Sequence, residues 1–158
     1  MMPWVDEVIM GGTFDHLHQG HKALLEAAIS MGNFVRVGIT TDDFAKSLRR
    51  SDSHIHLMQP LEIRIEKLEN YLLSRGCEKF EIIEIDDRYG FALNSPDAEG
   101  IVVTEETYPT GVDINKLRTM NNMDQLLILV IPFVFDDEGI IISSRRIRQQ
   151  LAEITEKE

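Results

Sequence analysis

Cysteine and long apolar runs are nearly absent from this chain of 158 residues. Cys77 is the only cysteine, so no disulfide can form within the chain, as is usual in a reducing cytoplasm. Residues 1–12 have neither a basic start nor a long apolar core, which argues against a signal peptide. The longest apolar run, residues 126–135, contains Pro132 and falls short of the roughly 18 residues of a membrane span. These absences predict a cytoplasmic protein without a membrane segment.

Positive charge is also scarce, with 16 Lys and Arg against 27 Asp and Glu, a formal net charge of -11. Such a surface repels nucleic acid phosphates, so no nucleic acid partner is expected. An anionic ligand would therefore need a local pocket of positive charge. The one basic cluster that stands out is SRRIR, residues 144–148, which marks that segment as part of a candidate site.

Two nucleotide-binding signatures are missing, the G-x-G-x-x-G pattern of dinucleotide loops and the G-K-[ST] ending of a P-loop. Apolar and amphipathic segments instead alternate along the chain. Strands are expected at residues 5–10, 34–40, 79–85, 100–104 and 125–131, and helices at 21–32, 42–49, 61–76, 111–122 and 143–154. Residues 50–59 are polar and are expected to form a mobile loop. The pattern predicts an α/β fold, a largely parallel sheet with helices on both faces, in a single domain of residues 1–158.

Residues 10–28, MGGTFDHLHQGHKALLEAA, place three histidines between an expected strand and an expected helix. The two leading glycines let the backbone approach a ligand, and Thr13 adds a hydroxyl donor. The helix that begins near Gly20 directs free N–H groups at the loop, which favours an anion. His18 and His21 are three residues apart, so both imidazoles can face the same volume and donate to phosphate oxygens, charged near neutral pH. The segment therefore predicts a phosphate site.

Two other uses of these histidines stay open. His16, His18 and His21 could offer three nitrogens to zinc, although only Asp15 stands beside them as a further ligand. Alternatively, the histidines could be half-buried caps of the helix that bind no ligand.

A second segment, ISSRRIR, points to the same chemistry. Ser143 and Ser144 stand at the expected start of the last helix, where hydroxyls and free N–H groups favour an anion. Arg146 and Arg148 follow and could neutralise it. Two such helix starts in one small α/β chain predict a ligand with several phosphates.

These two segments resemble the HxGH and ISSxxxR-type motifs of a nucleotidyltransferase superfamily. The first motif reads HQGH at residues 18–21, and the second lies in residues 142–148. Within the superfamily the chain is similar to phosphopantetheine adenylyltransferases of the archaeal and eukaryotic type, through GIVVTEETYPTGVDINKLR, PLEIRIEKLENYL and IDDRYGFA. The resemblance runs over residues 8–149 and implies a Rossmann-like nucleotidyltransferase fold.

The resemblance also implies a reaction, in which 4'-phosphopantetheine attacks the α-phosphorus of ATP and gives dephospho-coenzyme A and pyrophosphate. Mg²⁺ is expected to be bound through the ATP phosphates, with no metal ligand from the protein. By matching position, Thr13 orients the incoming phosphate and His21 donates to the α-phosphate. His18 contacts the β- and γ-phosphates, and Lys46 bridges the attacking phosphate and the α-phosphate. The nucleophile is already a phosphate oxygen, so positioning and charge stabilisation suffice without a general base.

Further nucleotide contacts are expected from several segments of the chain. They are Gly11, Phe14, Gly20, Thr104, Glu105, Tyr108, Arg118, Ser143, Ser144, Arg146 and Arg148. Tyr89 is expected beside the acceptor, together with Thr13 and Lys46. Arg145 and Phe91 depart from the pattern of the family, where a small hydroxyl residue and a proline are usual.

Two alternative functions remain. A related adenylyl- or cytidylyltransferase could use the same chemistry on FMN, nicotinamide mononucleotide or an alcohol phosphate, because acceptor choice lies in loops. A non-catalytic nucleotide-binding module could have kept the fold. The TEETY segment argues against the first, and the complete set of phosphate donors argues against the second. The oligomeric state is not readable from the sequence, and a homo-oligomer stays open.

Overall fold

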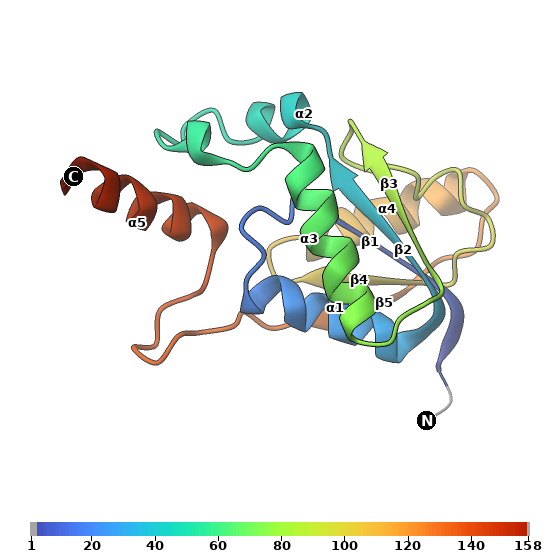
Figure 1. Cartoon of the computed structure of the whole chain (residues 1–158). Coiled ribbons are helices and arrows are strands. Elements are labelled where there is room, and N and C mark those ends of the chain that lie inside the picture. The colour runs from blue at the N-terminus through green and yellow to red at the C-terminus, as the bar shows by residue number, and fades with distance from the viewer. Residues whose placement is uncertain (1–2, 158) are drawn as a thin grey trace.

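Five parallel strands form one sheet in this protein, which a computed structural model describes from residue 3 to residue 157 (Figure 1). The strands are β1 (Val5–Gly12), β2 (Gly32–Thr40), β3 (Phe80–Ile85), β4 (Gly100–Thr104) and β5 (Leu127–Ile131). Their order is β3-β2-β1-β4-β5, and every neighbouring pair is parallel. The order reverses between β1 and β4, and in such sheets ligands bind beyond the carboxyl ends of the strands at that point. The predicted α/β fold is confirmed.

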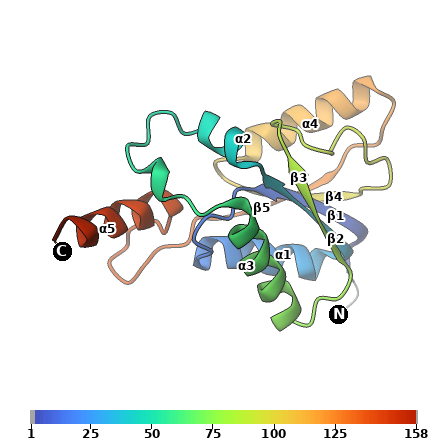
Figure 2. The same ribbon diagram turned by 45° about the horizontal axis from the view of Figure 1, so that its top comes forward.

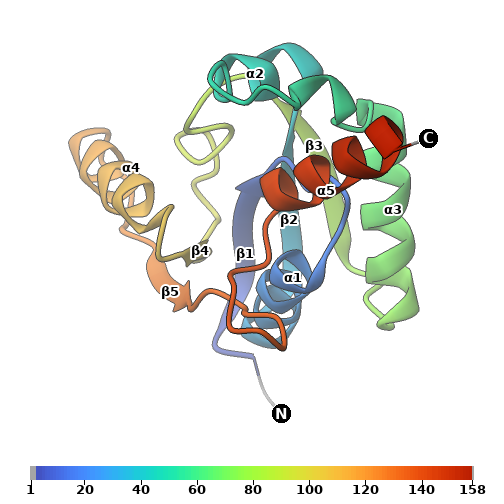
Figure 3. The ribbon, with the colours of Figure 1, turned by 90° about the vertical axis from the view of Figure 1, so that its left-hand side faces the viewer.

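Helices cover both faces of the sheet (Figures 2 and 3). The helices α1 (Gln19–Met31) and α3 (Leu61–Ser74) lie on one face, and α4 (Tyr108–Met120) lies on the other. Three further helical elements, α2 (Asp42–Ser47), the 3-10 helix η1 (Ile55–Leu57) and α5 (Ser144–Lys157), lie beyond the carboxyl ends of the strands. The last helix contacts η1 and stands apart from the sheet.

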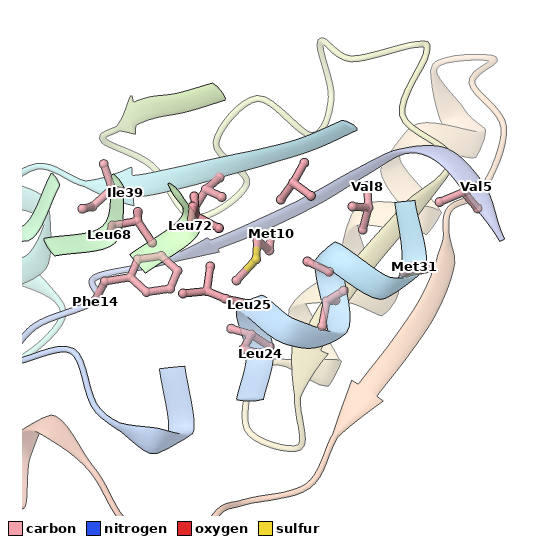
Figure 4. Close-up of a cluster of buried hydrophobic side chains, with 14 residues drawn as sticks. Val5, Val8, Met10, Phe14, Leu24, Leu25, Met31, Ile39, Leu68 and Leu72 are labelled. Atoms are coloured by element: carbon pink, nitrogen blue, oxygen red, sulfur yellow. The ribbon is translucent and has the colours of Figure 1, made fainter. Parts of the chain in front are cut away.

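The larger hydrophobic core lies between the sheet and the helices α1 and α3 (Figure 4). Val35, Val37 and Ile39 alternate along β2 and are at most 1% exposed, as the period of the strand predicts. Leu25 of α1 and Leu68 of α3 belong to the same cluster and are fully buried, and Leu68 lies beside Ile39 in Figure 4. Burial of each such side chain stabilises the fold by about 1.5–3 kcal/mol. This core fixes the ends of β1 and β2, from which the site is built.

The opposite face of the sheet carries a smaller core under α4, formed by Ile9, Ile101, Val103 and Ile114 among others. The helix begins at Tyr108, three residues before the predicted start, because Pro109 suits the first helical turn, where no N–H donor is required. The predicted boundary was therefore too late.

Gly32 joins α1 directly to β2 without a connecting loop. A Cβ atom at this position would lie 2.8 Å from Cγ1 of Val8, so only glycine lets the chain pass this close to β1. None of the described helices, in residues 3–157, combines the length and the apolar character that crossing a lipid bilayer requires.

Candidate active site

The loop between β1 and α1 is held in a fixed shape at the carboxyl end of the sheet. Phe14 and His16 adopt φ angles of 54° and 47°, a left-handed conformation that is uncommon for residues other than glycine. The side chain of Phe14 is 1% exposed and anchors the loop in the larger core. The hydroxyl of Thr40 donates to Oγ1 of Thr13 at 2.9 Å, which joins the ends of β1 and β2.

His18 and His21 cap the start of α1 with their own side chains. The N–H of Gly20 donates to Nδ1 of His18 at 3.1 Å, and the N–H of His18 donates to Nδ1 of His21 at 3.2 Å. The two imidazole rings stack with their centroids 3.7 Å apart. A Cβ atom at Gly20 would lie 2.9 Å from Cε1 of His18, so a side chain there would displace the imidazole. The glycine of the HQGH motif is therefore a requirement of packing.

The same hydrogen bonds select one tautomer of each ring. Both Nδ1 atoms accept, so in the neutral imidazoles Nε2 of His18 and of His21 carries the proton. Burial lowers the pKa of His18 to about 4 and that of His21 to about 3. The expectation that these rings are charged near neutral pH was therefore wrong. They are neutral donors whose Nε2–H groups remain available.

We expect these lowered pKa values to make folding stability depend on pH. Below their ordinary pKa of 6.5 both imidazoles bind protons in the unfolded chain but stay neutral in the folded protein until about pH 4 and 3. The free energy of unfolding should therefore decrease as the pH falls from 6.5 towards 4. Urea unfolding at about pH 7 and about pH 5 would measure this loss.

The prediction is tested with one variant of the capping pair, H18N, and with one control variant at an exposed histidine, H56N. H18N retains a cap acceptor but cannot titrate, so it should show a smaller loss of stability in acid. H56N replaces an exposed histidine in η1 and should behave like the wild type. Equal acid sensitivity of both variants would contradict the proposed origin.

A cavity of about 390 Å³ opens beside the two histidines. Both predicted helix starts line it, because His18, His21, Ser143 and Ser144 all belong to its wall. The hydroxyl of Ser144 donates to the carbonyl oxygen of Asp15 at 2.7 Å, which ties the start of α5 to the histidine loop. The two motifs are thus brought together across more than a hundred residues of sequence.

Arg148 ties α5 to this site through a buried ion triad. Its guanidinium donates to Asp15 and Asp52, with 2.8 Å between Nη2 and Oδ2 of Asp52, and all three side chains are at most 5% exposed. Burial alone would raise the pKa of Asp52, but the N–H of His54 and the guanidinium outweigh it and lower that pKa. Arg148 was expected to neutralise phosphates; in the structure its guanidinium instead joins two buried carboxylates, which is a structural role.

Asp52 corrects a second expectation. Residues 50–59 were predicted to be a mobile polar loop; the segment is a loop of turns that contains η1 and buries Asp52 and Met58. Asp15 also receives the N–H of Gln59 at 2.8 Å. One end of the loop is therefore bound to the histidine segment directly, and the Asp52 end is bound to it through Arg148. Sequence polarity misled here because the charge of Asp52 is neutralised by a residue 96 positions away.

Arg64 is a site-positioning residue that the sequence analysis missed. It is fully buried and donates to the carbonyl oxygens of Thr13 and Thr40 at 2.9 and 2.8 Å, and to Asp42 at 2.7 Å. It therefore joins the ends of β1 and β2 to α2. A signal existed, because Arg64 precedes the buried Leu68 by four residues and lies on the apolar face of α3.

Arg118 and Arg146 do not line the cavity. Arg118 is fully buried and donates to four backbone carbonyl oxygens, including those of Ala92 and Ser95 at 2.8 and 2.9 Å. It holds the loop before β4 against α4, and these bonds do not support the predicted contact with the nucleotide. Arg146 forms an ion pair with Asp136 and does not line the cavity.

The other predicted nucleotide contacts divide between inside and outside the cavity. Gly20 and Thr104 line it, whereas Glu105 and Tyr108 are exposed outside its wall. Glu106, the neighbour of Glu105, lines the cavity instead. Lys46 is exposed on α2 and lines neither this cavity nor the pocket described next.

A second, largely apolar pocket lies on the α4 side of β1. Gly11 lines this pocket and not the cavity, and Tyr89 and Phe91 border it from the loop after β3. Arg88 and Thr110 supply the polar groups of its wall. Thr13 is buried beside Thr40 and lines neither hollow. The arrangement offers one polar and one apolar compartment, the first lined by His18 and His21 and the second by Gly11 of β1.

No group of three or more His, Cys, Asp or Glu side chains in the described part of the chain could hold a metal ion. His16, the third histidine of the zinc alternative, contacts the carbonyl oxygen of Leu57 through Nε2 at 2.9 Å. It is therefore directed towards η1, whereas His18 and His21 stack on each other. This geometry does not support the zinc alternative.

The chain is similar in sequence and fold to several known proteins. A family model described as cytidylyltransferase-like matches residues 9–150. A phosphopantetheine adenylyltransferase of Methanopyrus kandleri is 38% identical over 148 residues, covering 93% of this chain and 91% of that protein. One from Methanothermobacter thermautotrophicus is 37% identical and covers 90% and 82%. A solved structure of a protein with unknown function from Archaeoglobus fulgidus has a TM-score of 0.69 and 33% identity, covering 79% of this chain and 88% of that chain.

The two motif segments that meet in the cavity both lie within the matched region. The chain therefore belongs to the cytidylyltransferase-like family and, within it, to the phosphopantetheine adenylyltransferases.

Proposed function

We propose that this protein transfers the adenylyl group of ATP to 4'-phosphopantetheine, giving dephospho-coenzyme A and pyrophosphate. The observation that carries the proposal is the convergence of the HQGH and ISS segments on one cavity beside an apolar pocket. The archaeal relatives named for this activity support the choice of acceptor.

The polar cavity suits the triphosphate of ATP. Its wall combines the Nε2–H donors of His18 and His21 with Ser143 and Ser144, and the hydroxyl of Ser144 would have to exchange its bond to Asp15 for a phosphate oxygen. Neutral donors and a helix start can stabilise phosphate oxygens without the cost of burying a further charge. We assign the β- and γ-phosphates to the serines and His18, and the α-phosphate to His21.

The apolar pocket suits the pantetheine arm. Its wall is formed mainly by aliphatic and aromatic side chains, among them Ile85, Tyr89 and Phe91, with few polar groups. A flexible chain with two amides and a thiol would bury its methylene groups there. Its terminal phosphate would then lie at Thr13, next to the α-phosphate of ATP.

The reaction follows from this placement. A phosphate oxygen of the acceptor forms a bond to the α-phosphorus, the bond to the β-bridging oxygen breaks, and pyrophosphate carries away the electron pair. The chain's own residues hold the two anions in line and stabilise charge on the α-phosphate, with His21 as the donor. We propose, from the family resemblance, that Lys46 bridges the two phosphates when ATP is bound, which requires its long flexible side chain to move in from the exposed surface of α2.

A divalent cation accompanies ATP in this reaction, and we infer that it is Mg²⁺ bound through phosphate oxygens. The acidic residues nearest the histidines fit this view, because Asp15 and Asp52 are already engaged by Arg148. When bound, the cation neutralises the leaving pyrophosphate and so eases departure.

We further propose that residues 1–158 form one domain that works in the cytoplasm without a nucleic acid partner. The match over residues 9–150 supports one domain, the single Cys77 suits a reducing compartment, and the net charge of -11 disfavours nucleic acid. Assembly into a homo-oligomer stays open and would be measured by light scattering.

The activity is identified by finding which acceptor substrate causes pyrophosphate release from ATP. Purified protein is incubated with ATP, Mg²⁺ and either 4'-phosphopantetheine, FMN or nicotinamide mononucleotide, and pyrophosphate release is followed. Of the three acceptors, we expect only 4'-phosphopantetheine to cause pyrophosphate release. The second product should have the mass of dephospho-coenzyme A. Faster release with another acceptor would instead make the protein a sister enzyme. ATP binding without release from any acceptor would indicate a non-catalytic module.

A further inference from the structure

Three arginines line the polar cavity, but they differ in what already surrounds them. Arg148 is saturated, because Asp15 and Asp52 receive its guanidinium. Arg145 is exposed on α5, where solvent screens its charge. Arg49 is half-buried in the wall beside the histidines. The cations of the cavity are therefore not equivalent as ligands for an anion.

Arg49 forms no ion pair in the described part of the chain, although Asp15 and Glu106 lie near enough to attract its charge. Its Nη1 donates to the carbonyl oxygen of Ala45 at 3.0 Å, and no carboxylate there lies within ion-pair distance. Burial, and then the nearby Arg148, lower the pKa of Arg49, as expected for a cation taken out of water beside another cation. Its charge also contributes to lowering the pKa of His21.

Such a group gains more than the other two from an incoming anion. A half-buried guanidinium has already lost part of its hydration, so a phosphate restores the missing interaction. Arg148 would first have to release a carboxylate, which leaves a buried charge unpaired. Arg145 would gain only a screened surface contact.

We propose that Arg49, rather than Arg148 of the ISS motif, is the arginine that neutralises the β- and γ-phosphates of ATP. This role rests on the proposed function, and it deepens that function by assigning the cation of the triphosphate subsite. The planar guanidinium suits this task, since it can donate two parallel hydrogen bonds to phosphate oxygens while retaining the bond to Ala45.

Isothermal titration with MgATP, inorganic pyrophosphate and AMP tests the proposal. R49Q is compared with R50Q, a matched control whose side chain is exposed next to Arg49 and outside the cavity wall. We expect R49Q to weaken MgATP and pyrophosphate at least about tenfold while AMP changes less than about twofold. R50Q should bind all three like the wild type. R49K, which keeps the charge but loses the planar fork, should fall between them.

The outcomes separate this proposal from the proposed function. MgATP binding by R49Q as tight as that of the wild type, or an equal loss for AMP, would overturn the role of Arg49 alone. A wild-type protein that binds no MgATP would overturn the proposed function, and this role with it. Thermal unfolding of R49Q serves as the folding check, and R49K supplies the comparison if R49Q does not fold.

Discussion

Replacement of His21 by asparagine lowers kcat for pyrophosphate release by at least about a hundredfold and leaves the Kd for ATP nearly unchanged. The reason is geometric. Asparagine places an amide oxygen near the position of Nδ1, so it still accepts the N–H of His18 and preserves the cap of α1. What it removes is the distal Nε2–H group, the donor that we assign to the charge developing on the α-phosphate.

A second variant separates the donor from the imidazole ring. H21Q places an amide nitrogen near the position of Nε2, so it should recover part of the activity that H21N loses. Single-turnover kinetics and ATP titration on both variants supply the measurement. If kcat and ATP affinity fell together in H21N, the histidine would contribute uniform binding and not stabilisation of the transition state.

Replacement of Arg148 by methionine lowers the free energy of unfolding by about 3–5 kcal/mol. The substitution leaves the carboxylates of Asp15 and Asp52 buried without their shared cation. Truncating one member of a buried ion network costs more than the network itself contributes, because the remaining charges stay desolvated. Urea unfolding monitored by circular dichroism measures the difference.

The matched control is R145M, which removes an arginine of the same helix from an exposed position. It should change the free energy of unfolding by no more than about 0.5 kcal/mol. Adding D15N and D52N to R148M should restore much of the lost stability, because the uncompensated charges disappear. Equal effects of R148M and R145M would show that the triad is not the anchor of α5.

Much of the fold could be predicted from local patterns. The alternation of Val35, Val37 and Ile39 located β2, and the spacing of Leu24 and Ala28 located the buried face of α1. The strand order was beyond reach, because it depends on pairings between distant segments and has no local signature. A largely parallel sheet nevertheless followed from the alternation of strands and helices, and in the structure all strand pairs are parallel.

The candidate site was predicted well where a motif is local and poorly where its chemistry is long-range. The HQGH segment caps and lines the cavity as its spacing indicated. Arg118 and Arg148 were assigned to phosphates because basic residues in a motif suggest an anion. Whether an arginine is available to bind phosphate depends on the carbonyl and carboxylate groups of distant segments. A local stretch of sequence does not show these partners. The neutral state of His21 has the same origin, since burial is a tertiary property.

The contacts of Asp15 with Ser144 and Arg148 span 129 and 133 residues. The ribosome therefore synthesises all five strands before it synthesises α5, the helix that completes the cavity wall. A nascent chain that ends before α5 could form the sheet and the histidine loop. It would lack the part of the cavity wall that α5 contributes. Unfinished copies would thus be unable to capture ATP, and their two acidic side chains, left without a counterion, would hasten their own unfolding and removal.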